Sequence, residues 1–273
     1  MPTVVSMTVA VDVDGPIAWR QAGLPDGEHV ALLHGLGGSR TAWEPQLAAF
    51  AEAGYCVAAW DMPGYGASAP IEPLSFELLA DAVGRWLDAF GAESAHIVGL
   101  SLGGMIAQHA ALRLQGRVRS LALLDTSPAF GLDGTTTANA WLDQRLRPLA
   151  AGETPATIAP AVLKAIMADT VSRSVLEEAI AAMERIPSSG LAAAARCLVT
   201  HDVRLRLHEV AVPTLVIVGE HDRETPLTYA SYLADHIARA RLAIVPGAGH
   251  ISNLEQPARV NELLLEFLAE SPR

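Results

Sequence analysis

Short apolar runs rich in β-branched residues alternate along the chain with longer stretches in which apolar residues recur every three or four positions. The short runs are typical of buried strands, and the longer stretches are typical of helices that cover a sheet. This alternation predicts an α/β fold with a mostly parallel, eight-stranded sheet flanked by helices. The expected strands are residues 9–13, 17–21, 29–33, 55–60, 95–99, 118–125, 213–219 and 241–245, and the expected helices among them are residues 42–53, 76–90, 102–114, 227–238 and 257–268.

Two local signals refine this pattern. Asp14 and Gly15 separate the first two expected strands, and such a turn predicts an antiparallel hairpin. Ser75 stands directly before the strongly apolar helix at 76–90, where its hydroxyl can accept a hydrogen bond from a free backbone N–H. We therefore expect Ser75 to be the N-cap of that helix, without a full capping box because position 78 is Leu.

The alternation stops between Ser127 and about position 210. Several helical stretches follow one another there, separated by Gly or Pro residues, and no strand pattern interrupts them. We interpret this segment as a helical cap inserted after the sixth strand. The predicted division is a core formed by residues 1–127 and 211–273 and a cap formed by residues 128–210. The main expected cap helices are residues 141–149, 158–167, 175–186 and 191–199.

Composition narrows the classes of partner. The 273 residues include 30 acidic and 19 basic side chains, which gives a net charge of −11. Nucleic acids and anionic membrane surfaces need a cationic face, so neither is expected as the main partner. Hydrophobic residues make up 51% of the chain and charged residues 18%, so one large domain can bury a sizeable core.

The chain carries no signal for export or membrane insertion, and we expect a cytoplasmic protein. Cys56 and Cys197 lie far apart in apolar runs and indicate neither a disulfide framework nor a zinc site. Residues 1–13 are apolar but lack the basic start and the cleavage site of a signal peptide. No apolar run approaches the roughly 18 residues of a membrane helix.

The strongest chemical signal is the segment Gly99-Leu100-Ser101-Leu102-Gly103, which lies between an expected strand and an expected helix. G-x-S-x-G in this setting is typical of a nucleophile elbow, in which a sharp turn exposes the serine hydroxyl over the C-terminal end of the sheet. The flanking positions carry glycine because such a turn leaves no room for side chains. The pattern therefore predicts a nucleophilic serine.

A serine hydroxyl is a weak nucleophile at neutral pH and needs a histidine base that a carboxylate orients. Asp222 and His250 each follow the end of an expected strand, where a loop can hold them above the sheet. The chain order Ser101, Asp222, His250 is the order that a nucleophile elbow of this kind predicts. We therefore predict that these residues are the catalytic nucleophile, acid and base.

With these motifs in order, the sequence resembles the α/β-hydrolase family over nearly its whole length. His34-Gly35-Leu36-Gly37-Gly38 is similar to the family's HG loop, and residues 61–68, Asp-Met-Pro-Gly-Tyr-Gly-Ala-Ser, are similar to its D-x-P-G-x-G-x-S loop. Attack by the serine creates an oxyanion that needs preorganised N–H donors. The backbone N–H of Leu102 is one expected donor, and the resemblance implies that the N–H of Leu36 is the other.

Within the family, the elbow Gly-Leu-Ser-Leu-Gly-Gly-Met and residues 247–257 are similar to 3-oxoadipate enol-lactonases and related carboxylesterases. This resemblance implies hydrolysis of a small-molecule ester or lactone through an acyl-serine, without a cofactor. Hydrolases of carbon–carbon bonds in ring meta-cleavage products are the nearest alternative, although they often have Asn where this chain has Leu100. Receptor-like members that bind small molecules with slow turnover remain a second alternative, and a perhydrolase side activity remains open.

Two positions in the predicted site have competing interpretations. Asp125, at the end of the sixth strand, is the main alternative for the acid, because some family members place the carboxylate there. Glu220 and Glu224 are weaker alternatives close to Asp222. We expect His34 to brace its loop rather than to act as a base.

Other polar motifs have simpler structural interpretations. We expect residues 61–68 to position neighbouring loops rather than to take part in the chemistry. His201 and His221 each adjoin an aspartate, but no third ligand lies at a suitable spacing, so we expect no metal site.

Large apolar side chains near the elbow and in the cap are candidates for the substrate pocket, although each can equally serve the core. These candidates are Trp43, Met105, Phe130, Trp141, Met167 and Met183. The cap arginines are expected mostly on solvated helix faces, where one could hold a substrate carboxylate. These arginines are Arg145, Arg147, Arg173, Arg185, Arg196, Arg204 and Arg206.

Overall fold

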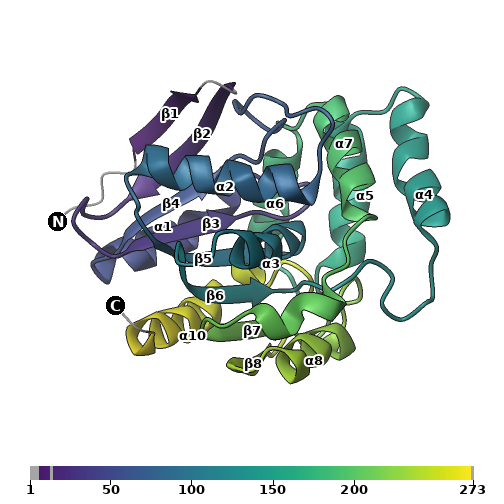
Figure 1. Cartoon of the computed structure of the whole chain (residues 1–273). Helices are drawn as coiled ribbons and strands as arrows, with labels where there is room; N and C mark the ends of the chain where they lie inside the picture. The colour runs from purple at the N-terminus through teal and green to yellow at the C-terminus, as the bar shows by residue number, and fades with distance from the viewer. Residues whose placement is uncertain (1–5, 13–14, 272–273) are drawn as a thin grey trace.

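The computed structural model describes residues 6–12 and 15–271, in which eight strands form one sheet (Figure 1). The strands are β1 (Ser6–Asp12), β2 (Gly15–Ala22), β3 (His29–Leu33), β4 (Cys56–Trp60), β5 (Ala95–Leu100), β6 (Val118–Leu124), β7 (Thr214–Gly219) and β8 (Ala240–Val245). Their order across the sheet is β1-β2-β4-β3-β5-β6-β7-β8. β2 pairs antiparallel with β1 and β4, and the remaining pairs are parallel. The predicted mostly parallel, eight-stranded sheet is confirmed.

The first two strands form the predicted antiparallel pair, with Asp12 opposite Gly15. Val13 and Asp14, which we expected at the end of a strand and in the turn, lie outside the described residues, as do residues 1–5.

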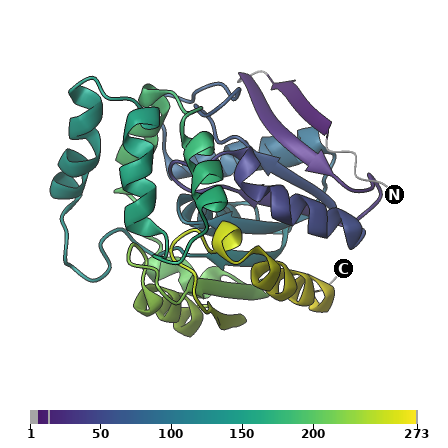
Figure 2. The ribbon, with the colours of Figure 1, turned by 180° about the vertical axis from the view of Figure 1, so that it is seen from behind.

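Helices cover both faces of the sheet (Figures 1 and 2). One face carries α1 (Glu44–Glu52) and α10 (Pro257–Glu270). The other face carries α2 (Phe76–Phe90), α3 (Leu102–Arg113) and α8 (Leu227–His236). Each face packs its own apolar cluster against the sheet, so the sheet is buried between two layers and its strand ends are fixed in place.

Capping residues explain where individual helices begin and end. The Ser75 hydroxyl accepts a hydrogen bond from the Leu78 N–H, so the predicted N-cap of α2 is confirmed, and Gly91 ends the helix with a φ of 81°. The helix expected over 42–53 is instead divided into a 3-10 turn, η1 (Arg40–Trp43), and α1. Pro45 explains the division, because proline favours the first turn of a helix and disfavours its interior.

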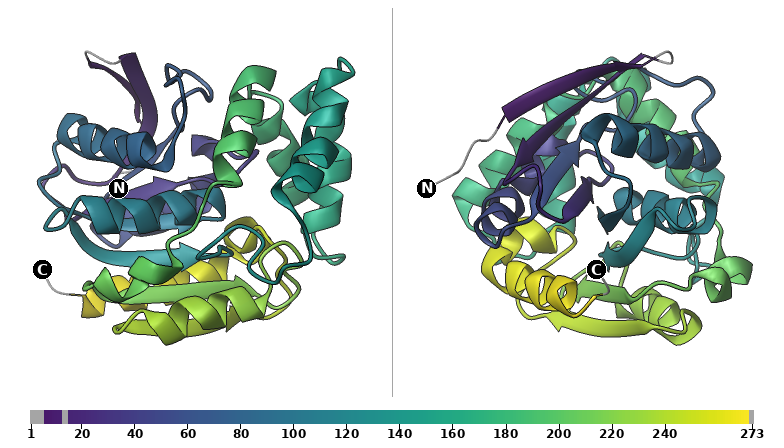
Figure 3. Two further views of the ribbon diagram at one scale, coloured as in Figure 1. Left: turned by 45° about the vertical axis from the view of Figure 1, so that its right-hand side comes forward. Right: turned by 60° about the vertical axis from the view of Figure 1, so that its left-hand side comes forward.

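Four helices lie between β6 and β7 and stand beyond one end of the sheet (Figure 3). They are α4 (Ala138–Ala150), α5 (Pro155–Ile166), α6 (Arg173–Met183) and α7 (Ser188–Leu198). The helical insertion after the sixth strand is therefore confirmed. α4 begins three residues earlier than expected because the Thr137 hydroxyl caps it at the Ala140 N–H.

The two segments that connect these helices to the sheet are bonded to each other. The Phe130 N–H donates to the His201 carbonyl at 2.9 Å, and the Val203 N–H donates to the Pro128 carbonyl at 2.9 Å. The chain therefore enters and leaves the helical insertion at one place, and a further 3-10 helix, η2 (Arg204–Glu209), follows before β7; that residues 128–210 form a separate unit stays a prediction. We keep the predicted term cap for these residues. No helix in the described part of the chain is both long and apolar enough to span a membrane.

Candidate active site

Ser101 occupies the sharp turn between β5 and α3. Its φ of 53° lies in the left-handed region, which residues other than glycine adopt only with strain. Hydrogen bonds hold the turn: the Ser101 N–H donates to the Leu124 carbonyl at 2.8 Å, and the Thr126 hydroxyl donates to the Ser101 carbonyl at 2.7 Å. The end of β6 therefore fixes the serine backbone, and its hydroxyl faces the cap.

Close packing requires both glycines of the G-x-S-x-G segment. A Cβ atom on Gly99 would lie 2.3 Å from the Gly103 carbonyl oxygen, and a Cβ atom on Gly103 would lie 2.1 Å from the Leu33 carbonyl oxygen. Real Cβ atoms essentially never approach backbone so closely. The elbow can thus form only because these two side chains are absent.

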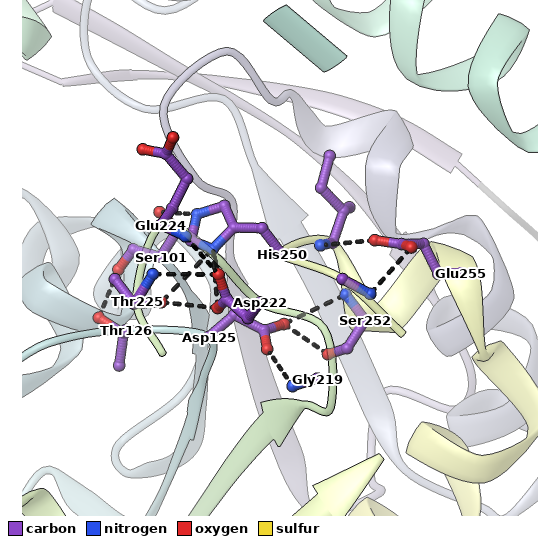
Figure 4. Close-up of polar contacts among 12 residues, drawn as sticks. Ser101, Asp125, Thr126, Gly219, Asp222, Glu224, Thr225, His250, Ser252 and Glu255 are labelled. Carbon is purple, nitrogen blue, oxygen red and sulfur yellow. Dashed lines mark hydrogen bonds and ion pairs between the residues drawn. The ribbon is translucent and has the colours of Figure 1, made fainter. Parts of the chain in front are cut away.

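Three of the predicted site residues meet above the C-terminal ends of the strands (Figure 4). The Ser101 Oγ lies 2.9 Å from the His250 Nε2, and the His250 Nδ1 lies 3.0 and 2.9 Å from the two carboxylate oxygens of Asp222. A neutral imidazole that donates its Nδ1 proton to the carboxylate keeps a free lone pair on Nε2. That lone pair can accept the serine proton.

The Asp222 carboxylate is held by its own loop. Its Oδ1 accepts hydrogen bonds from the N–H groups of Glu224 at 2.9 Å and Thr225 at 3.0 Å, and its Oδ2 accepts one from the Thr225 hydroxyl at 2.8 Å. Burial acts to raise the pKa of Asp222, but the charge of His250 and these hydrogen bonds outweigh it and lower the pKa. Asp222 is therefore ionised at neutral pH.

The same pair shifts the histidine in the opposite direction. Burial acts to lower the pKa of His250, but the adjacent Asp222 carboxylate more than compensates, with smaller contributions from Asp125 and Glu224, and the pKa lies above the ordinary value of 6.5. His250 is thus strongly basic for an imidazole. The Asp222 carboxylate therefore stabilises the imidazolium that forms when His250 takes up a proton.

Asp125, the alternative acid, is fully buried between the end of β7 and the residues that follow His250. Its carboxylate accepts hydrogen bonds from the Gly219 N–H at 2.8 Å, the Ser252 N–H at 3.1 Å and the Ser252 hydroxyl at 2.5 Å. Burial, followed by the negative charge of Asp222, raises the pKa of Asp125 to about 8. Through these hydrogen bonds, Asp125 connects the end of β7 with the residues that follow His250.

The two glutamates near Asp222 have other partners. Glu220 accepts a hydrogen bond from the Gly247 N–H at 2.9 Å. Glu224 forms a two-pronged ion pair with Arg145 of α4, at 3.0 and 2.9 Å. Of the carboxylates considered for the acid, Asp222 is the one that contacts the His250 Nδ1, from which the Thr225 hydroxyl also lies 3.4 Å.

Glu255 is a residue of this site that the sequence did not single out. Its carboxylate accepts hydrogen bonds from the N–H groups of Gly249 at 2.9 Å and Ile251 at 3.0 Å, on either side of His250, and from Ala168 in the cap at 2.8 Å. The His250 N–H itself donates to the carbonyl of Ile166 at the end of α5, at 3.0 Å. Glu255 lies in the short helix α9 (Ser252–Glu255) directly after the histidine, and this placement is the signal that could have identified it.

The predicted HG loop runs beside the serine. A Cβ atom on Gly35 would lie 3.0 Å from the Ser101 Cβ, and Leu36 lines a cavity together with Ser101. The Leu102 N–H belongs to the first turn of α3, where N–H groups have no partner within the helix. Both backbone groups assigned to the oxyanion hole thus belong to segments that border the serine, while their role stays a prediction.

His34 braces the loop, as expected. Its Nδ1 lies 2.9 Å from the Gly35 carbonyl oxygen, and its Nε2 accepts a hydrogen bond from the Met62 N–H at 3.0 Å. In the 61–68 loop, the Ser68 hydroxyl donates to the Asp61 carbonyl at 2.6 Å and accepts from the Ala18 N–H at 2.9 Å. These bonds connect the two loops to each other and to β2.

Four of the six candidate pocket residues line a cavity at Ser101, while their role in substrate binding stays a prediction. Met105, Phe130 and Trp141 line a cavity that also contains Ser101 and His250. Trp43 does not reach the cavities at Ser101 and is wrongly placed in the pocket by the sequence: it is fully buried in the cluster under α1, because η1 turns its ring toward the sheet. Met183 lines a second cavity that also borders Ser101 and His250, and Met167 is buried in the core.

The two histidines that adjoin aspartates have ordinary partners. His201 is buried, with its Nδ1 3.2 Å from the Nε2 of His109 and its Nε2 2.9 Å from the Ser127 carbonyl oxygen. His221 is exposed beside Glu220. Over residues 6–12 and 15–271, no three metal-ligating side chains of the His, Cys, Asp or Glu type converge.

Comparisons with known proteins place this geometry in a family. Residues 28–257 match the model of the alpha/beta hydrolase fold family. The chain is 33% identical to a Variovorax paradoxus protein named "Putative carbamate hydrolase RutD". The alignment covers 93% of this chain and 96% of that protein. The chain is 26% identical to 3-oxoadipate enol-lactonase 1 from Acinetobacter baylyi, in an alignment that covers 96% of this chain and 93% of that protein. The enol-lactonase structure from Burkholderia xenovorans covers 96% of the chain, and the chain covers all of that structure, with a TM-score of 0.87 at 27% identity. The chain therefore belongs to the α/β-hydrolase family and resembles its enol-lactonases.

Proposed function

We propose that the protein is a serine hydrolase that cleaves a small carboxylic ester or lactone through an acyl-serine intermediate. The observation that carries this proposal is the continuous line of hydrogen bonds from Ser101 through His250 to Asp222. Residues in this arrangement convert an alcohol into a nucleophile. The names of the relatives, which include enol-lactonases, support a hydrolytic reaction at a carbonyl carbon.

In the first half of the cycle, the Ser101 Oγ attacks the carbonyl carbon while its proton moves to the His250 Nε2. The carbonyl oxygen becomes an oxyanion beside the N–H groups of Leu36 and Leu102. The bond between the carbonyl carbon and the alcohol oxygen then breaks, and His250 returns the proton to that oxygen. In a lactone the alcohol stays attached to the acyl group. Asp222 remains ionised and keeps the imidazole in the Nδ1–H tautomer.

In the second half, water takes the place of the alcohol. His250 removes a proton from the water as its oxygen attacks the acyl-serine, and the serine oxygen leaves with that proton. The products are a carboxylic acid and the free enzyme. No electron donor, metal or cofactor is needed to balance either half.

Carbon–carbon bond hydrolysis is the nearest alternative, and Leu100 beside the serine disfavours it. A receptor-like protein with slow turnover is the second alternative. Both alternatives use the Ser101 hydroxyl, as the proposed ester or lactone hydrolysis does. The substrates that are turned over therefore distinguish the three functions better than any structural feature.

The decisive experiment measures kcat and KM on a panel of aryl esters, aliphatic esters, enol-lactones and ring meta-cleavage products with the wild type and Ser101→Ala. We expect ester or lactone turnover that falls by at least a thousandfold in the variant, with its Tm unchanged within about 2 °C. Equal activity in the variant would refute the mechanism. Tight binding without turnover would favour a receptor, and exclusive turnover of meta-cleavage products would favour carbon–carbon hydrolysis.

A further inference from the structure

Three cavities border Ser101 and His250; the smallest has a volume of about 40 Å³, and the two larger ones differ in chemical character. One has a volume of about 140 Å³ and the other about 310 Å³, and both are bordered by Trp141, Arg145 and Glu224. A substrate whose carbonyl carbon lies at the serine therefore extends into both cavities. We call them the apolar lobe and the polar lobe.

The apolar lobe is lined by residues of the cap and of the HG loop. Apart from residues shared with the other lobe, every side chain that lines it is apolar, including Ile158 and Val162 of α5 and Leu191 and Ala195 of α7. Its volume is close to that of the engineered cavity of about 150 Å³ that binds benzene in T4 lysozyme. The lobe therefore fits about six carbon atoms.

The polar lobe faces solvent. Its own lining includes the hydroxyl groups of Thr135 and Tyr229 and the charged side chains of Asp133 and Arg223. Asp133, Thr135 and Arg223 are exposed, so water reaches this lobe. A substrate group placed there can exchange hydrogen bonds with water for hydrogen bonds with these side chains.

The order of the reaction assigns the two halves of the substrate, and this step rests on the proposed ester hydrolysis. The acyl group stays on the serine while the alcohol leaves and water enters. The lobe with buried apolar walls suits the group that stays, and the lobe with exposed polar walls suits the group that leaves. We propose that the substrate combines an apolar acyl group of about six carbons, or one phenyl ring, with a polar alcohol group.

Charge at the border of the lobes supports an uncharged acyl group. Arg145 is the cation that lines the apolar lobe, but Glu224 already occupies it with two hydrogen bonds, and its guanidinium lies 5.2 Å from the centre of the Trp141 ring. A carboxylate inside the lobe would lose its hydration and face apolar side chains, which is costly. The paired Arg145 and Glu224 add no net charge there.

The test uses 4-nitrophenyl esters of straight-chain acids from acetate to dodecanoate, so that the leaving group stays constant. Each methylene buried in the apolar lobe is expected to raise kcat/KM by up to about fourfold, until the lobe is full near hexanoate. We expect kcat/KM to fall at least about tenfold from hexanoate to dodecanoate. The 4-nitrophenyl monoester of adipate, with a terminal carboxylate, is expected at least about tenfold below hexanoate.

Variants at the wall of the lobe test its position. Ala195→Leu fills part of the lobe and is expected to move the optimum to butanoate, whereas Ala192→Leu, on the same helix but outside both lobes, leaves the optimum at hexanoate. Should Ala195→Leu fail to fold, Val162→Ala enlarges the lobe from a half-buried position and is expected to move the optimum to octanoate.

The polar half is tested with glycerol monohexanoate and ethyl hexanoate, which differ only in the alcohol. We expect kcat/KM to be several-fold higher for the glycerol ester, and equal or lower values would overturn this half of the proposal. Three results would overturn the proposal for the acyl half. They are a kcat/KM that is constant or rises to dodecanoate, a higher kcat/KM for the adipate ester than for hexanoate, and an optimal chain length that does not change in Ala195→Leu or Val162→Ala. If no ester of any length is hydrolysed, or Ser101→Ala remains active, the proposed function has failed instead.

Discussion

Replacing Asp222 by Asn is expected to trap His250 in the wrong tautomer. The Asp222 Oδ1 accepts two backbone N–H groups, from Glu224 and Thr225, so an asparagine places its amide oxygen there. Its NH₂ group then takes the position of Oδ2, 2.9 Å from the His250 Nδ1. An NH₂ group can only donate, so it favours an Nδ1 that accepts and a proton on Nε2, in competition with the amide oxygen that lies 3.0 Å from Nδ1. The nitrogen that faces Ser101 then carries a proton and can no longer remove one.

The expected loss in kcat is about 10⁴-fold, the size of the effect when the acid of a serine protease triad is replaced by its amide. This corresponds to about 5.4 kcal/mol of transition-state stabilisation. The residual activity should also change its pH dependence. The pKa of His250 is raised because Asp222 outweighs burial, so without that carboxylate the pKa falls, and the acidic limb of the kcat/KM profile shifts to lower pH.

The assay is ester hydrolysis between pH 5 and pH 10, with Tm measured in parallel. Asp125→Asn is the matched control, because Asp125 is a buried carboxyl group nearby whose hydrogen bonds go to Gly219 and Ser252 rather than to His250. Its amide would face either the Gly219 or the Ser252 N–H with a donor, which costs about 1–3 kcal/mol of stability but leaves the His250 tautomer intact. A smaller loss of kcat in Asp222→Asn than in Asp125→Asn would refute this assignment of the acid.

Three further perturbations have defined outcomes. Glu255→Gln leaves one of the N–H groups around His250 without an acceptor. We therefore expect kcat to fall more than KM rises, and the free energy of unfolding to decrease by about 1–3 kcal/mol. The same change at the exposed Glu262 should alter neither quantity. Burial lowers the pKa of His109 to about 4 and that of His201 to about 3. The unfolded chain therefore binds protons below pH 6.5 that the folded protein does not, so the protein loses stability as the pH falls from 6.5 toward 4. Tm should drop over that range, and it should drop less steeply in His109→Gln. Gly103→Ala should prevent soluble folding because its methyl group meets the Leu33 carbonyl, whereas Gly116→Ala, with open space but a φ of 86°, should cost only about 1–2 kcal/mol.

The sequence predicted the features that repeat or that sit at strand ends. Strands and helices were found because their apolar periodicity reports burial directly. Ser101, Asp222 and His250 were expected to meet because each follows the C-terminal end of a strand by one to five residues, and parallel strands bring their C-terminal ends to one edge. Ser75 was found because capping is a local interaction between residues three positions apart.

Long-range partners left no such pattern. Glu255 lies 87 positions from the Ala168 N–H that it binds, and Asp125 lies 127 positions from Ser252, so nothing in either neighbourhood announces the contact. Trp43 was misplaced for a related reason. A tryptophan near a loop can face a cavity or the core, and its direction depends on the short η1 turn, which the sequence pattern merged into α1.

The contacts of the cap with the core are unequal on its two sides, and this asymmetry bears on how a product can leave. On the α5 side, the His250 N–H bonds to Ile166 and the Glu255 carboxylate bonds to Ala168, so moving this side would disturb the histidine. On the α4 side, the link is the partly exposed ion pair of Arg145 with Glu224, and such pairs contribute only about 0–1 kcal/mol. The described side chains of α4 include none that is buried. Opening of the cap is therefore expected to cost least beside the polar lobe, where the alcohol of the proposed ester substrate would leave while Ser101 and His250 stay in contact.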